Sequence, residues 1–195
     1  MSTLLPQLPR GSYRWQYISN NIDLTSSDTG VTQRVSKLGD KFEVSTTFRV
    51  RGEQGIGLMA VLNSNKSKKV RLPFPQTMDI GSPGNAVKVN GAASGTTINL
   101  KGFTPNYKLK AGQFISVVHN AKRYLHQVVF DVTANASGVA QTVIVAPMLR
   151  APVIGDETVE VAEPTIEGYL TTNTNEWVSD FIKSVAVTVT VREAE

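Results

Sequence analysis

The chain has 195 residues, of which 41% are hydrophobic and 18% are charged, so it can bury a core in one domain or in two small ones. It contains no cysteine, which excludes disulfides, thiolate nucleophiles and cysteine-ligated zinc. The net charge is only +4, the first residues lack a charged n-region, and no apolar run approaches the length of a membrane span. We therefore expect neither a cleaved signal peptide nor a membrane partner.

Short runs of alternating apolar and polar residues, separated by Gly, Asn, Asp and Pro, predict a chain composed mostly of β-strands. The first clear run is FEVSTTFRV at 42–50. Six more follow between residues 86 and 162, namely AVKVN, TTINLKGF, QFISVV, RYLHQVVFDV, AQTVIVAP and ETVEVA. The last run, KSVAVTVTVRE, is typical of a sheet with one buried side, because its alternation places four valines on one face, Val185, Val187, Val189 and Val191.

The segment 52–65, GEQGIGLMAVLNSN, is the one candidate for a helix, with Ile56, Met59 and Ala60 at helical spacing. Three glycines in its first half lower its helix propensity. The segment also contains GIGLMA, which matches the glycine pattern of a dinucleotide-binding loop. Because a Lys-rich and then a Pro-rich stretch follows, rather than repeated strand and helix alternation, we expect no nucleotide and no other cofactor.

Two turn-rich segments, at 73–84 and at 161–169, are typical of domain boundaries. They predict two β-domains. Residues 76–162 form an inserted domain, and residues 1–75 plus 163–195 form a discontinuous host domain. If the five or six short strands of the insertion close on themselves, they form an OB-like Greek-key barrel.

The only two histidines, His119 and His126, lie in QFISVVHNAKRYLHQV, a pattern that predicts two strands around a turn at Asn120 and Ala121. A catalytic histidine needs a nucleophile or an orienting carboxylate within reach, and a metal-binding histidine needs two or three further ligands. The nearest downstream acid, Asp131, has the opposite strand parity to His126. We therefore predict a packed structural role for His126, a hairpin-turn role for His119, no catalytic residue and no metal site.

Charge is distributed unevenly along the chain. Basic residues gather in one stretch, Lys66, Lys68, Lys69 and Arg71. The stretch 151–170 contains no Lys or Arg and has five acids, Asp156, Glu157, Glu160, Glu163 and Glu167. Two interpretations remain open. These stretches are ordinary solvated loops, or they steer association between copies of the chain or with a partner.

A basic chain with an OB-like barrel is also compatible with binding of single-stranded nucleic acid, in which bases stack on aromatic rings along a positive groove. The residues that could supply the stacking and the charge are Phe103, Tyr107, Phe114, Tyr124 and Phe130, together with Lys101, Lys108, Lys110, Lys122 and Arg123. Aromatic residues within short strands usually belong to the core, which argues against nucleic acid. Surface carbohydrate is a further alternative, because OB-like folds bind oligosaccharides.

Several segments together resemble a known family. They are LPFP after the basic stretch, GFTPNYKLKAGQFI, RYLHQVV, the turn at Ser137 and Gly138, VIVAPMLRAP with Met148 to Pro152 at its end, and finally GYL before a terminal valine strand. In this order they are similar to the distal tail proteins of long, flexible-tailed bacteriophages. The resemblance covers nearly the whole chain and is one of pattern, without a catalytic motif.

This resemblance implies an all-β virion protein, a belt-like β-sandwich domain with an inserted OB-like barrel, that forms a ring, hexameric by analogy, and is no enzyme. The ring would join the tail tube protein to the tail-tip hub protein, after assembly in the host cytoplasm, and its barrel would hold side fibres or a host-surface glycan. A head-to-tail ring needs two complementary patches on each subunit. We expect the basic stretch 66–71 and the acidic stretch 156–167 to form such a pair.

This pairing predicts that Lys68→Glu combined with Lys69→Glu weakens self-assembly, because each substitution replaces attraction across the subunit contact by repulsion. Light scattering after size exclusion should show a smaller mass for the double variant than for the wild type. An unchanged oligomer mass would contradict the assignment of these residues to the interface.

Overall fold

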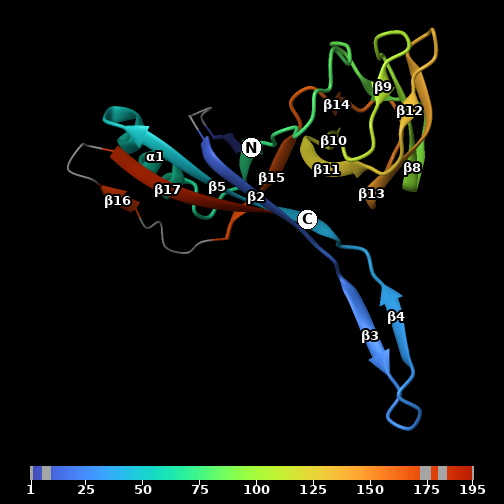
Figure 1. Cartoon of the computed structure of the whole chain (residues 1–195), viewed down its shortest axis with the longest axis horizontal. Helices are drawn as coiled ribbons and strands as arrows, with labels where there is room; N and C mark the ends of the chain where they lie inside the picture. The colour runs from blue at the N-terminus through green and yellow to red at the C-terminus, as the bar shows by residue number, and fades with distance from the viewer. Residues whose placement is uncertain (1, 6–9, 172–176, 180–183, 195) are drawn as a thin grey trace.

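The computed structural model describes residues 2–5, 10–171, 177–179 and 184–194. Three parts are visible in Figure 1: a long twisted sheet with one helix, a barrel-like sheet, and a hairpin that projects away from both. The fold is all-β, a sandwich-type body with a barrel, so the predicted fold class is confirmed. Among the described residues, no helix is long and apolar enough to cross a bilayer.

The body is built on one sheet, whose strands run in the order β1, β6, β15, β17, β5 and β2. Their bounds are β1 Thr3–Leu4, β2 Arg10–Ile18, β5 Lys41–Arg51, β6 Val70–Pro73, β15 Thr165–Leu170 and β17 Ser184–Glu193, and β16, Trp177–Ser179, pairs with β17. The central pair, β17 and β5, is antiparallel along almost its full length. Val187, Val189 and Val191 are buried as predicted, whereas the side chain of Val185 lies outside the described part.

Residues 53–64 form a helix, α1 (Glu53–Ser64). The predicted helix is therefore present in the segment 52–65, despite its three glycines. Its buried face consists of Gly55, Leu58 and Leu62. Of the three residues at helical spacing, Met59 packs against the core, whereas Ile56, 69% exposed, and Ala60 face solvent. Leu58 and Leu62, one turn apart, join the core cluster of the body. This packing stabilises a helix whose intrinsic propensity is low.

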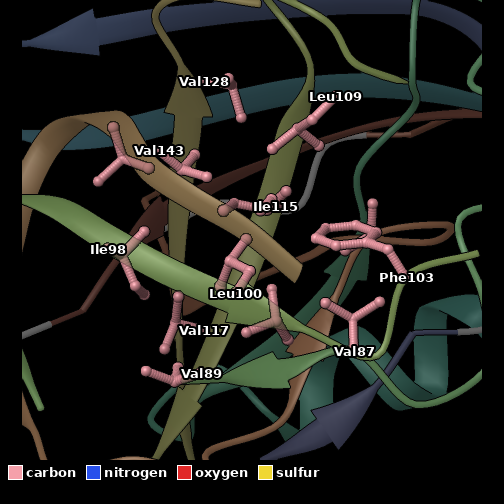
Figure 2. Packing of buried hydrophobic residues seen from close by; sticks show 14 of the residues in the cluster. Val87, Val89, Ile98, Leu100, Phe103, Leu109, Ile115, Val117, Val128 and Val143 are labelled. Atoms are coloured by element: carbon pink, nitrogen blue, oxygen red, sulfur yellow. The ribbon is translucent and has the colours of Figure 1, made fainter. Parts of the chain in front are cut away.

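The barrel is a six-stranded sheet in the order β14, β10, β11, β13, β8 and β7. The bounds are β7 Lys88–Val89, β8 Ala93–Lys101, β10 Phe114–His119, β11 Lys122–Val128, β13 Val139–Val153 and β14 Val159–Glu160. Backbone hydrogen bonds from Val89 N to Glu157 O and from Val159 N to Val87 O, both 2.9 Å, join its two edges. Figure 2 shows the apolar side chains that fill the barrel, among them Leu100, Ile115, Val117 and Val143.

Two of the predicted strands differ from the observed ones in extent. The run RYLHQVVFDV is split, because β11 ends at Val128 and the short β12 (Val132–Thr133) pairs instead with β9 (Lys108–Leu109). Between them, the Asp131 carboxylate accepts the Ala111 N–H at 2.7 Å. By contrast, β13 is much longer than its predicted run, with register shifts along its pairing with β8.

The hairpin of β10 and β11 turns at Asn120 and Ala121, as predicted. Both residues have positive φ, 50° and 59°, and His119 pairs directly with Lys122. Two consecutive left-handed residues in a two-residue loop define a type I′ turn, which matches the twist of the flanking strands. The turn therefore fixes the register of the whole hairpin, including which side chains of β10 and β11 face each way.

Strands β10 and β11 are buried on both faces, because they lie between the two cores. We call this boundary between the two cores the seam. Ile115 and Val117 point into the barrel cluster, whereas Phe114 and Leu125 belong to the cluster of the body. The Phe114 ring lies 4.4 Å from that of Phe74 and 5.5 Å from that of Trp15, between ring centroids. The boundaries of the domains, 1–75 plus 163–195 and 76–162, stay a prediction.

Phe114→Ala should lower the free energy of unfolding by about 3–5 kcal/mol, because it leaves a cavity where the two cores meet. Urea denaturation followed by fluorescence would measure this change. Phe130→Ala is the matched control. Phe130 is 60% exposed, so its removal should change the free energy of unfolding by less than about 0.5 kcal/mol. Equal effects of the two substitutions would contradict the role of Phe114 in the seam.

Candidate interaction surfaces

His126 is a buried residue. Its Nδ1 donates to the Pro147 carbonyl oxygen at 2.8 Å, because a carbonyl can only accept. Its Nε2 is buried without a hydrogen-bond partner. Burial lowers the pKa of His126 to about 4, and the nearby Arg150 charge acts in the same direction, although the bond to Pro147 opposes it. The predicted packing and hydrogen bonding of His126 are thus confirmed, and its structural role stays a prediction.

His119 ends β10 beside the turn, and both its ring nitrogens have partners. Nε2 lies 2.9 Å from the Asn120 amide nitrogen, which donates, so Nδ1 carries the proton and donates to Glu157 at 3.2 Å. A carboxylate therefore does orient this histidine, but none of its hydrogen-bond partners in the described chain is a hydroxyl nucleophile. Within that same part, no three His, Asp or Glu side chains gather closely enough to hold a metal ion.

The buried His126 predicts a specific pH dependence of stability. In the unfolded chain it takes up a proton near pH 6.5, whereas the folded chain resists protonation down to a pKa of about 4. The free energy of unfolding should therefore fall by up to about 3 kcal/mol as the pH drops between these values. Glu193 opposes this fall, because burial raises its pKa.

Comparison of the wild type with His126→Gln isolates the histidine, because Glu193 is present in both proteins. Urea titrations between pH 7 and pH 4 should show a smaller loss of stability for His126→Gln than for the wild type. Parallel pH profiles for wild type and His126→Gln would refute the assignment.

The predicted basic stretch lies at the junction of body and barrel. Lys66, Lys68 and Lys69 form the turn after α1, and Arg71 follows in β6. The turn of the β10 and β11 hairpin brings Lys122 and Arg123 to the same place. Together with Ser2, Asn120, Ala121 and Glu167, all of these residues except Lys66 line a hollow of about 590 Å³.

The predicted acidic stretch is largely engaged within its own chain. Asp156 pairs with Lys101 at 2.7 Å, and Glu157 accepts from His119 and from the backbone at residues 154 and 155. Glu160 pairs with Arg123 at 2.7 Å. Glu163 is exposed and lines a second hollow, of about 520 Å³, together with Arg71 and Arg123. Folding thus places the basic and acidic stretches side by side in one chain.

The projecting hairpin, which we call the arm, consists of β3 (Asn21–Thr25), β4 (Thr32–Ser36) and the turn between them (Figure 1). Every residue from 19 to 34 is exposed. One face of the arm is polar, with a bidentate pair from Arg34 to Asp23. The other face carries Ile22 and Leu24, of which Leu24 is 55% exposed. Sequence reasoning missed the arm, although Ile22 and Leu24 alternate with polar residues before an SSDTG turn.

The base of the arm is held by a set of hydrogen bonds. The Asp40 carboxylate accepts from the Asn20 backbone N–H at 2.7 Å and from the Tyr17 hydroxyl at 2.5 Å. The Asn20 amide donates to the Leu38 carbonyl at 2.8 Å, and Arg150 donates to the Asp40 carbonyl at 2.9 Å. These contacts fix the direction in which the arm leaves the body.

The aromatic residues considered for base stacking are mostly inaccessible. Phe103 and Tyr107 stack on each other in the barrel core, with ring centroids 5.2 Å apart, and Phe114 is in the seam. Tyr124 is half-buried under Arg150, whose guanidinium carbon lies 5.9 Å from the ring centroid. Only Phe130 of this set is well exposed. No continuous aromatic platform for nucleic acid bases is therefore formed by these five residues.

No protein-family model matches the sequence, and a search of curated proteins finds no match.

Proposed function

We propose that this chain is a structural protein of a bacteriophage tail, which assembles with copies of itself into a ring and joins the tail tube to the tail tip. The single observation that carries the proposal is the arm. It combines an apolar face with two strand edges that pair with no other described strand, and it leads away from the body and barrel of its own chain. The proposal assigns no enzymatic activity and no cofactor to the chain.

The arm needs a partner for physical reasons. An isolated two-stranded hairpin is marginally stable in water, and open edges together with apolar side chains promote pairing with another chain. The fixed base directs the arm outward, so another molecule must cover its apolar face. A second copy is the partner we propose, because each copy also offers an edge strand, β2, on which Trp15 and Tyr17 are half-exposed.

A contact between the arm of one copy and the body of the next uses two different surfaces, which is the head-to-tail arrangement. Such contacts close into a ring when the rotation between neighbours divides a full turn. The resemblance to distal tail proteins supports a hexameric ring in the virion, between tube and hub proteins. The basic stretch 66–71 then has a secondary role, because the acids proposed as its partner are mostly paired within the chain.

Leu24→Glu should abolish ring formation without unfolding the subunit, because it places a charge on the exposed apolar face of the arm. Light scattering of the full chain after size exclusion should show a ring-sized mass for the wild type and a monomer mass for Leu24→Glu. Negative-stain images of the wild-type peak should show closed rings. The melting temperatures of the two proteins should agree, since Leu24 is outside both cores.

Thr25→Glu is the matched control, because it adds the same charge to the opposite face of the arm. It should retain the wild-type mass. If both substitutions leave the mass unchanged, the arm is not the assembly contact. If the wild type remains a monomer even when mixed with tail tubes, the proposed function itself fails.

A further inference from the structure

The hollow at the junction of body and barrel has a marked excess of positive charge. Five cationic side chains line it against one carboxylate, that of Glu167. They come from two separate parts of the chain, Lys68, Lys69 and Arg71 from the body and Lys122 and Arg123 from the tip of the barrel hairpin. Only docking of the barrel on the body brings these charges together.

Two of the cations are already engaged. The Arg123 Nε donates to Glu160 at 2.7 Å, and its Nη1 lies 3.9 Å from Glu167. The ammonium of Lys69 lies 5.6 Å from the centroid of the Tyr169 ring. Glu167 itself also accepts the Arg123 backbone N–H at 3.2 Å. These contacts hold the wall of the hollow in place and leave the remaining cations to face it.

The other three cations, Lys68, Arg71 and Lys122, have no carboxylate within 4.0 Å among the described residues. Arg71 has one long hydrogen bond, 3.4 Å from Nη2 to the Ser2 carbonyl. Its Nε is buried and has no hydrogen-bond partner. A guanidinium held so weakly beside like charges is costly, because buried donors of charged groups are normally satisfied. Solvent alone does not offset the cost of this buried and weakly bonded arginine. An anion bound in the hollow would compensate its charge.

We propose that this hollow binds a ligand with two or more phosphate groups. Because Arg123 is paired with Glu160, the cations of the hollow without a carboxylate within 4.0 Å among the described residues are Lys68, Arg71 and Lys122. Two phosphates near neutral pH supply enough negative charge to compensate these three cations. Lysine and arginine are the side chains that most commonly bind phosphate. Among the described residues, no aromatic side chain lines the hollow, so this part of the chain offers no surface there on which a nucleic acid base would stack. The ligand is recognised through its phosphates.

Calorimetric titration of the full chain with inorganic tripolyphosphate tests this proposal. Tripolyphosphate should bind at least tenfold more tightly than orthophosphate, and added salt should weaken its binding. Lys122→Glu should raise the Kd for tripolyphosphate at least tenfold. This residue is exposed and lies outside the predicted subunit contact. Lys108→Glu, at another exposed lysine of the barrel, makes the same charge change and should retain the wild-type Kd.

Three outcomes would overturn the proposal. They are absence of tripolyphosphate binding to the wild type, equal weakening by Lys108→Glu and Lys122→Glu, and equal affinity for orthophosphate and tripolyphosphate. ATP should bind no more tightly than tripolyphosphate, and tenfold tighter binding of ATP would show that the site recognises a nucleoside instead. Leu24→Glu should bind tripolyphosphate as the wild type does, so failure of ring assembly and failure of this site are measured separately.

Discussion

A single buried ion pair, between Arg150 and Glu193, connects every part of the molecule. The Glu193 carboxylate, at the end of β17, accepts from Arg150 at 2.8 Å, from the Phe42 N–H at 3.2 Å and from the Leu125 N–H at 2.8 Å. Arg150 in turn donates to the carbonyls of Asp40 and Ala194. Body, barrel and the base of the arm therefore meet at one pair, and a buried pair of this kind tolerates the loss of neither partner.

The seam around this pair determines where both candidate surfaces lie. Because β10 and β11 contribute to two cores at once, the barrel cannot rotate on the body without exposing Phe114 and Leu125. The hairpin turn with Lys122 is thereby held against the basic turn after α1, which creates the hollow. Arg150 also donates to the Asp40 carbonyl at the base of the arm, which fixes the direction in which the arm projects from the body. Both surfaces are consequences of how the two sheets dock.

Local patterns predicted much of the fold. The alternation in 42–50 and in the last valine strand corresponds to β5 and β17, because a sheet buried on one side imposes that period on its residues. The same alternation is present in the arm at Ile22 and Leu24, but it is short, and the sequence does not say that the hairpin stands away from both cores. Helical spacing did not show that Ile56 faces solvent, because the face of a helix is chosen by the sheet it packs on. The partners of Asp156 and Glu160 are distant in sequence or on other strands, and alternation carries no information about them.

The sequence by itself determined the all-β class, the turn at Asn120 and Ala121 and the packed position of His126, because the local alternation of residues carries these features. Only the tertiary structure decided that Lys68, Arg71 and Lys122 share one hollow, that the acidic stretch is satisfied internally, and that residues 19–34 stand free of both cores. The hollow depends on the docking of barrel on body, and the acidic pairs depend on contacts between barrel residues that are distant in the sequence. The burial and the electrostatic environment of a side chain depend on residues that are distant in the sequence, and a local pattern carries no information about those residues.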